Sequence, residues 1–198
     1  VGQTNPLAFP PMNTTTAAPE GEASLTNVFM VGMMGCGKSA IGRKIAESLN
    51  LTFLDTDDMI VEEAGRSIPE IFAAEGEAGF RLREKRALKS LKGSSGQVIS
   101  TGGGIVLSPD NRITLRSLGY GIWLTASVDK LLFRISQNRE RPLMQTANPR
   151  ETLLALLDER EPLYDEVADM VVDTSELTVC ETVHGLVECI NYHFACQL

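Results

Sequence analysis

A glycine-rich run near the start of the chain, Gly32-Met-Met-Gly-Cys-Gly-Lys-Ser39, places the strongest constraint on the fold. Gly32, Gly37, Lys38 and Ser39 meet the spacing G-x-x-x-x-G-K-S. Glycine allows the backbone to curl so that successive N–H groups point at phosphate oxygens. In such loops the lysine reaches the outer phosphates and the serine hydroxyl is a ligand of Mg²⁺. The run therefore predicts a nucleotide phosphate site between a strand and a helix.

The residues on both sides of this run have the pattern that a phosphate loop requires. The apolar stretch 28–31 directly before it predicts a buried strand. Directly after it, Ile41, Ile45 and Leu49 recur at helical spacing, so we expect a helix to begin near Lys38. The positive end of that helix would favour a bound anion. A glycine-rich turn that matched the spacing by chance would not need a buried strand before it or a helix after it.

Beyond the loop, strand-like runs alternate with helical patterns, which indicates an α/β domain with a mostly parallel sheet. Strands are expected at 28–31, 52–54, 98–100, 122–124 and 170–172. Helices are expected to begin near 38, 67 and 108 and to cover 80–91, 127–138, 149–160 and 178–194. Residues 1–26 have little periodicity, so we interpret them as a disordered leader or an expression remnant before a single domain, 27–198.

Composition limits the classes of partner. The net charge of −8 and the isoelectric point near 4.8 argue against nucleic acid or an anionic membrane, because both require a basic surface. No run of about 18 apolar residues is present, and residues 1–26 have no secretory signal pattern. The cysteines lack metal-binding or C-x-x-C spacing, which indicates reduced thiols in a cytoplasmic protein: Cys36, Cys180, Cys189 and Cys196.

Two carboxylates follow the second expected strand. Asp55 and Asp57 are two residues apart, so they project to the same side of an extended chain. They come at the carboxyl end of the strand, where open α/β sheets bind ligands. One is suited to the water shell of Mg²⁺, and the other to accepting a hydroxyl proton during phosphoryl transfer. The alternative is an acidic turn that caps the next helix, a role that we expect for Asp58.

Basic residues and a glycine triad are candidates for binding an anionic acceptor. Arg81 follows the apolar pair Gly79-Phe80, so we expect a partly buried guanidinium that needs a partner such as a ligand carboxylate. A surface ion pair with Glu84 is the alternative. The triad 102–104 follows a strand end, where glycines would let the backbone approach a small substrate. A plain flexible turn is the alternative there.

Two later segments also contain arginine. Residues 138–148 lack periodicity and include Arg139 and Arg141, so we expect a lid that closes over the phosphates, with a solvated loop as the alternative. Arg160 is expected at a helix end, where a cation would offset the dipole of the helix.

In this order, these motifs resemble those of the shikimate kinase family, and the combination is far more specific than any single motif. The resemblance extends from about residue 28 to residue 174. It is carried by VGMMGCGKSAIGR (31–43), LDTD (54–57), GRSI (65–68), IF (71–72), GE (76–77), GFR (79–81), TGGG (101–104), RPL (141–143) and PLY (162–164), with Glu84 and Arg160.

The resemblance implies a three-layer fold in which helices flank a five-stranded parallel sheet of order 2-3-1-4-5, with a mobile lid. It implies transfer of the γ-phosphate of ATP to the 3-hydroxyl of shikimate, in chorismate and aromatic amino acid biosynthesis, with Mg²⁺ as cofactor. The residues that would bind ATP are Gly35, Cys36, Gly37, Lys38, Ser39, Ala40, Arg134 and Arg141, of which Lys38 and Arg141 would also be catalytic.

The same resemblance assigns the acceptor and metal sites. The residues that would hold shikimate are Asp57, Arg81, Gly102, Gly103, Gly104 and Arg160, with Asp57 as the catalytic base. Ser39 and Asp55 would hold Mg²⁺. We expect a monomer. Some members of the family place a basic residue beside adenine after the last strand, whereas residues 175–177 are Ser-Glu-Leu here.

Other functions stay open on the sequence alone. A gluconate kinase or another small-metabolite kinase would share the phosphate loop but would not require Arg81, the glycine triad and Arg160 together. A catalytically silent nucleotide-binding module is a different class, which the loss of Lys38, Asp57 or Arg141 would have indicated. All three are present. A nucleoside monophosphate kinase usually needs a longer acceptor-binding segment.

Overall fold

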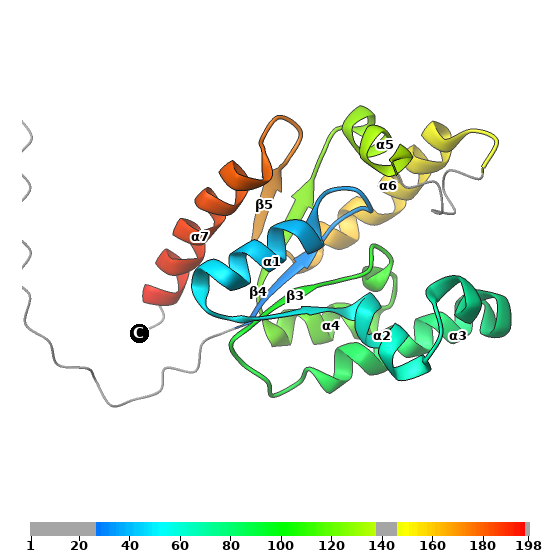
Figure 1. The fold of residues 1–198 in the computed structure, drawn as a ribbon, viewed down its shortest axis with the longest axis horizontal. Helices are drawn as coiled ribbons and strands as arrows, with labels where there is room; N and C mark the ends of the chain where they lie inside the picture. Colours follow the sequence, from blue (N-terminus) through cyan, green and yellow to red (C-terminus); the bar gives the residue numbers. More distant parts are fainter. Residues whose placement is uncertain (1–26, 138–145, 197–198) are drawn as a thin grey trace, which may run out of the picture.

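The computed structural model describes residues 27–137 and 146–196 (Figure 1). The segment predicted to be a leader, 1–26, and most of the predicted lid, including Arg141, lie outside the described residues. None of the described helices is both long and apolar enough to cross a membrane.

Five parallel strands form one sheet of order β2-β3-β1-β4-β5, as predicted. The strands are β1 (Asn27–Val31), β2 (Thr52–Asp55), β3 (Gln97–Ser100), β4 (Gly119–Thr125) and β5 (Met170–Asp173). The central strand β1 has β3 on one side and β4 on the other, and Val28 pairs with both Val98 and Tyr120. All residues of β1 are buried, which explains its continuous apolar run.

Helices cover both faces of the sheet, which gives the predicted three layers (Figure 1). The helices are α1 (Lys38–Leu49), α2 (Thr56–Ala64), α3 (Ile68–Ser90), α4 (Pro109–Leu118), α5 (Val128–Ser136), α6 (Pro149–Val167) and α7 (Val179–Ala195), with a 3₁₀ turn η1 (Ile105–Leu107). Val28 and Met30 pack against α1, α5 and α7. Phe29 and Val31 point to the other face and pack against α3, α4 and α6.

Asp55, and not Asp58, caps α2. The Asp55 side chain accepts a hydrogen bond from the backbone N–H of Asp57 (3.0 Å), which makes it the N-cap. Asp58 lies inside the first turn and forms an exposed ion pair with Arg43 (3.3 Å). The prediction for Asp58 was therefore wrong, because the strand ends one residue later than expected and the helix begins directly after it.

Helix α3 begins with the predicted capping box, in which Ser67 and Glu70 each satisfy the other's backbone N–H. The second predicted helix, 80–91, is part of the same element. Gly76, with φ 68° and ψ −175°, separates the two helical stretches and produces a kink. Phe72 and Phe80 pack against each other across this kink, with ring centroids 4.7 Å apart.

Helix α6 does not end near Arg160 as predicted but continues to Val167. Pro162 lies inside the helix, although proline removes one backbone hydrogen bond there. Tyr164 and Val167 are buried in the core beside Trp123, and this burial compensates for the lost bond. As a consequence, Arg160 is a buried residue in the middle of a helix and not a terminal cation.

Candidate active site

The carboxyl ends of β1, β2 and β3 meet beside the phosphate loop and enclose a pocket of about 330 Å³. The residues that line it are Met34, Gly35, Gly37, Lys38, Ser39, Ala40, Asp55, Asp57, Thr101, Gly102 and Gly103. A larger hollow of about 470 Å³ lies beside α7 and contains none of the predicted site residues. Nine of the predicted site residues therefore line the smaller pocket, whereas Cys36, Arg81, Gly104, Arg134 and Arg160 are not among its lining residues.

The phosphate loop joins β1 to α1 and curls around Lys38. Gly32 and Gly37 have φ of 139° and 102°, and a Cβ on Gly32 would collide with the carbonyl oxygen of Leu124. Lys38 Nζ donates hydrogen bonds to the carbonyl oxygens of Gly32 (2.8 Å) and Met33 (3.0 Å). Only 8% of Lys38 is exposed. The loop therefore holds the lysine at the N-terminal end of α1, where anions bind favourably.

Cys36 and Ala40 occupy the inner and outer sides of this loop. Cys36 is 1% exposed and packs in the core, so only its backbone is available to a nucleotide. Ala40 and Gly35 line the pocket directly.

Oxygen atoms gather where the loop faces β2 and β3. Ser39 Oγ donates a hydrogen bond to Asp55 Oδ2 (2.7 Å) and lies 3.2 Å from Ser100 Oγ. Hydroxyl and carboxylate oxygens are ligands that Mg²⁺ prefers. The described residues contain no cluster of His, Cys, Asp or Glu that could form a metal site by itself. This donor set suits an ion that binds through few protein ligands and the phosphates of a nucleotide.

Asp57 lies in the first turn of α2 and faces the same pocket. Its Oδ1 atom is buried and has no hydrogen-bond donor within the described ranges. Burial, followed by the charges of Asp55 and Glu84, raises the pKa of Asp57 to about 6, and Lys38 opposes this rise. Such a carboxyl group can exchange a proton close to neutral pH, as a general base must.

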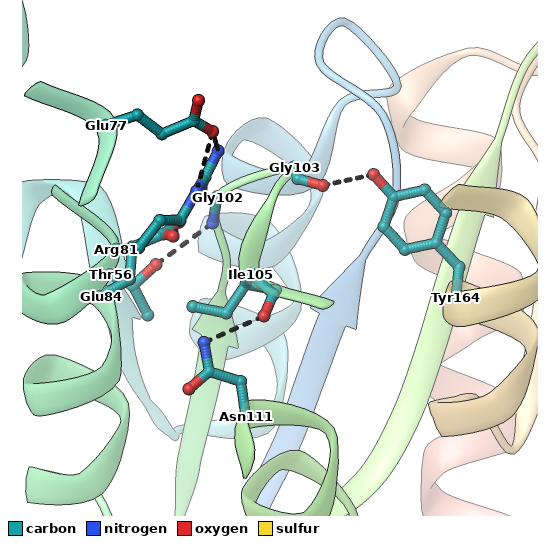
Figure 2. A network of polar contacts seen from close by, with 9 residues as sticks. All are labelled: Thr56, Glu77, Arg81, Glu84, Gly102, Gly103, Ile105, Asn111 and Tyr164. Atoms are coloured by element: carbon teal, nitrogen blue, oxygen red, sulfur yellow. Dashed lines mark hydrogen bonds and ion pairs between the residues drawn. The ribbon is translucent and has the colours of Figure 1, made fainter. Parts of the chain in front are cut away.

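The predicted glycine triad forms a tight turn after β3. Side chains of neighbouring helices form hydrogen bonds with its backbone (Figure 2). Gly102 donates its N–H to Thr56 Oγ1 on α2 (3.2 Å), and Tyr164 on α6 donates its hydroxyl to the carbonyl oxygen of Gly103 (2.5 Å). The turn is thus anchored from two sides.

The ends of charged side chains lie close to the glycines of the turn. A Cβ on Gly102 would lie 2.8 Å from Asp57 Oδ1 and 2.9 Å from Glu84 Oε1. A Cβ on Gly104 would lie 2.5 Å from Arg81 Nη1. Glycine therefore brings the acid and the arginine up to the same stretch of backbone.

Arg81 lies between two glutamates of its own helix (Figure 2). On the inner side it donates to Glu84 Oε2 (2.5 Å), and that side chain is only 1% exposed. On the outer side it contacts Glu77 Oε1 (3.1 Å), which is exposed. The ion pair with Glu84, weighed as an alternative on the sequence, is present but buried, and it holds the guanidinium beside the glycine turn.

Arg160 reaches the same region from α6. It is 9% exposed, and its Nε–H has no hydrogen-bond acceptor in the part of the chain that the structure describes, since Glu159 Oε2 at 3.7 Å is too distant. Its guanidinium lies close to the Tyr164 hydroxyl, whose pKa is raised well above the usual value by burial. A buried cation with an unmade hydrogen bond is suited to an anionic ligand.

Arg134 lies on the other side of the phosphate loop. Its guanidinium donates to the carbonyl oxygen of Thr174 (2.7 Å) and to that of Gly35 (3.4 Å). Thr174 Oγ1 in turn donates to the carbonyl oxygen of Cys36 (3.2 Å). Arg134 is therefore tied to the loop itself and to the residue that follows β5.

Known proteins resemble this chain in sequence. A sequence model of the shikimate kinase family matches residues 34–191. The chain belongs to this family. It is 46% identical over 169 residues to the shikimate kinase of Actinobacillus pleuropneumoniae, an alignment that covers 85% of this chain and 98% of the relative. It is 47% identical over 159 residues to that of Bordetella pertussis, covering 80% of this chain and 75% of the relative.

Solved structures of other shikimate kinases have the same fold. The Acinetobacter baumannii enzyme, determined in complex with shikimate, superposes with a TM-score of 0.81 at 38% identity, over 86% of this chain and 95% of its own. The Aquifex aeolicus enzyme gives 0.73 at 32% identity, over 83% and 96%. This shikimate kinase is accordingly an ATP-dependent transferase, and the gluconate kinase and silent-module alternatives are not favoured.

Several residues in or beside the site were not predicted as site residues in this shikimate kinase. Ser100 and Thr101 could have been recognised as polar residues at the carboxyl end of a strand. Tyr164 and Thr174 gave no such signal, because each acts through backbone carbonyls that only the fold brings near.

Proposed function

We propose that this shikimate kinase binds its acceptor between Asp57, Arg81, Arg160 and the glycine turn 102–104, and transfers the γ-phosphate of ATP to the 3-hydroxyl of shikimate. One observation carries the proposal: Asp57 Oδ1 and Arg160 Nε are both buried without hydrogen-bond partners among the described residues. Leaving such groups unpaired costs about 1–3 kcal/mol each. A ligand with hydroxyl groups at one end and a carboxylate at the other supplies both missing partners.

Supporting this assignment, the glycine turn lies between the two groups. Asp57 is next to Gly102, and Arg160 is close to Tyr164, which is bonded to Gly103. The related Acinetobacter baumannii enzyme was solved in complex with shikimate, a ring that carries this combination of hydroxyl and carboxylate groups.

The nucleotide is assigned to the other half of the pocket. We propose that Gly35, Cys36, Gly37, Lys38, Ser39 and Ala40 bind its phosphates and that Arg134 lies along the nucleotide. Lys38 is preorganised by its contacts with the loop carbonyls, and it would exchange these for phosphate oxygens when ATP binds. Arg141, predicted to be a lid residue, lies outside the described residues.

Mg²⁺ is proposed as the cofactor, with Ser39 and Asp55 as the residues that would hold it. When bound, the ion would neutralise charge on the transferring phosphates. The described cysteines form no disulfide, which supports the proposed cytoplasmic location. We propose that the protein is a monomer.

In the proposed reaction, Asp57 accepts the proton of the acceptor hydroxyl as its oxygen attacks the γ-phosphorus. With a pKa of about 6, Asp57 is ionised at neutral pH and still basic enough to take the proton. Arg81 and Arg160 would hold the carboxylate of the substrate, so that the reactive hydroxyl faces Asp57.

A substrate panel tests this proposal. In a coupled assay for ADP with Mg²⁺ and ATP, we expect release that depends on shikimate and does not depend on gluconate or AMP. Release that is independent of shikimate, or that gluconate supports equally well, would contradict the proposed acceptor.

A further inference from the structure

The hydroxyl group of Tyr164 reaches the glycine turn from the hydrophobic core. Tyr164 is completely buried on α6, and its ring packs beside Trp123, with ring centroids 5.9 Å apart. Its hydroxyl donates a hydrogen bond of 2.5 Å to the carbonyl oxygen of Gly103, a residue that lines the pocket (Figure 2). A phenylalanine ring would fill the same space in the core. The hydroxyl therefore adds a polar contact with the site, which core packing alone does not require.

Arg160 lies four residues before Tyr164, on the same face of α6. Burial raises the pKa of Tyr164, and the positive charge of Arg160 beside the hydroxyl opposes this rise. A hydroxyl group has one proton, so the Tyr164 oxygen that donates to Gly103 can act only as an acceptor toward its other neighbours. A cation beside that oxygen stabilises this orientation. Arg160 and Gly103 together therefore hold the hydroxyl in place.

The hydrogen bond to Gly103 also determines the direction of the next backbone N–H. The described peptide bonds are all trans, so the N–H of Gly104 points away from the carbonyl oxygen of Gly103. Figure 2 shows Tyr164 and Arg81 on opposite sides of the turn. The N–H of Gly104 is thus directed away from Tyr164, toward the side where Arg81 lies.

The N–H of Gly104 is a donor without a partner. Gly104 is a buried residue, and no acceptor within the described ranges binds its N–H. Buried backbone donors without a partner are rare in folded proteins. A Cβ on Gly104 would lie 2.5 and 2.6 Å from the two terminal nitrogens of Arg81, so the guanidinium is close to the same backbone. Two neighbouring donors of this kind suit a carboxylate, which accepts hydrogen bonds at both oxygens.

We propose that Tyr164 is a positioning residue of the acceptor site, whose hydroxyl holds the Gly103–Gly104 peptide so that the N–H of Gly104 faces the carboxylate of the acceptor beside Arg81. This inference rests on the proposed placement of shikimate on the glycine turn. It adds a core residue outside the pocket lining to those that determine how tightly the acceptor binds. The nucleotide half of the pocket is held separately, through the contacts of Lys38 with the loop carbonyls.

Tyr164→Phe tests the proposal, because it keeps the ring and removes only the hydroxyl. The peptide would lose its anchor, so part of the binding energy of the acceptor would be used to order the turn. We expect the KM for shikimate at saturating MgATP to rise about 10-fold. The KM for MgATP at saturating shikimate should stay unchanged. A residue that only packs the core would lower stability without this difference between the two substrates.

Tyr120→Phe is the matched control. It removes the same hydroxyl from a tyrosine on β4 that lines the hollow beside α7 and stacks on His193, with ring centroids 4.0 Å apart. Neither KM should change in this variant.

A measurement on the wild type keeps the proposal testable if Tyr164→Phe does not fold. An anion bound to the N–H of Gly104 would polarise the peptide and strengthen its carbonyl oxygen as an acceptor for Tyr164. In protein labelled with ¹³C at the tyrosine Cζ, we expect shikimate to move the signal of Tyr164. The signals of the other two tyrosines, Tyr120 and Tyr192, should stay in place. Their own phenylalanine variants assign them.

The outcomes separate this inference from the proposed function. A wild type that does not phosphorylate shikimate overturns the proposed function. An active wild type whose KM for shikimate is unchanged in Tyr164→Phe overturns the role of Tyr164 alone. An equal rise in both KM values, an equal rise in Tyr120→Phe, or a Tyr164 signal that shikimate leaves unmoved also overturns it.

Discussion

At the scale of single residues, the site is marked by polar groups that the folded chain leaves unpaired. Asp57 and Arg160 were both assigned from the sequence. For Asp57 the position after a strand already indicated a role in metal binding or proton transfer, and the family resemblance chose between them. From the residues alone, Arg160 was interpreted as a cation at the end of a helix. Only the family resemblance gave it a role in binding. Its burial in the middle of α6 could not be predicted, because it depends on core packing around Tyr164.

Asp57 should lower the stability of the free enzyme. Its folded pKa of about 6 lies above the ordinary value of 3.8, so the folded state binds more protons between these values and stability falls as pH rises through them. We expect Asp57→Asn to raise the free energy of unfolding by about 1–3 kcal/mol near pH 7.5, and therefore to unfold at a higher urea concentration. Near pH 4 we expect little gain. Turnover should fall by about 100-fold or more.

Urea titrations followed by the fluorescence of the single tryptophan, Trp123, would measure this difference. An equal gain at both pH values would show that the effect does not come from the charge of Asp57.

Arg81→Ala should weaken shikimate binding far more than ATP binding. Removal of a charged contact with a carboxylate is expected to raise the KM for shikimate about 10- to 100-fold. Arg83→Ala is the matched control, since Arg83 lies on the same helix but pairs with Glu75 (2.9 Å) and Glu63 (3.7 Å). Steady-state kinetics with each substrate varied in turn would decide, and equal losses for ATP and shikimate would argue against a carboxylate clamp.

At the scale of elements, periodicity and capping signals predicted all five strands and the starts of α1, α3, α4 and α7. The errors came where tertiary packing outweighs local preference. Pro162 and the expected C-terminal cation indicated the end of a helix, yet burial of Tyr164 and Val167 extends α6 by a further seven residues past Arg160. Two separate helices were expected where the structure has the single element α3 with a kink at Gly76, because a glycine within a helical pattern does not by itself say whether the helix ends or bends.

That kink yields a prediction for Gly76. Its φ of 68° and ψ of −175° fall in a region that is essentially restricted to glycine, so Gly76→Ala should lower the free energy of unfolding by about 1–3 kcal/mol. A Cβ there would meet nothing within 4 Å, so the loss would reflect backbone strain alone. Gly185→Ala in α7 is the control, with equally open space and helical geometry, and should be neutral or stabilising by up to about 1 kcal/mol.

Chemical denaturation of both variants measures this contrast. A loss in Gly185→Ala as large as in Gly76→Ala would contradict the assignment of strain to the kink.

At the scale of the whole molecule, the sheet order brings the site together. β2, β3 and β1 are adjacent, so Asp55, the triad 102–104 and the phosphate loop meet at one edge although they are far apart in the chain. The rule that ligands bind at the carboxyl ends of parallel strands predicted this meeting. It could not predict the approach of α3 and α6, which deliver Arg81 and Arg160 from outside the sheet. We propose that residues 27–198 form the single catalytic domain.

The most direct test of the account is to identify the product by ³¹P NMR after incubation of the enzyme with Mg²⁺, ATP and shikimate. We predict that ADP forms together with one new phosphomonoester, whose phosphorus couples to the ring proton at the carbon of the 3-hydroxyl. Free inorganic phosphate in place of this ester, or an ester at another hydroxyl, would contradict the proposed placement of shikimate against Asp57.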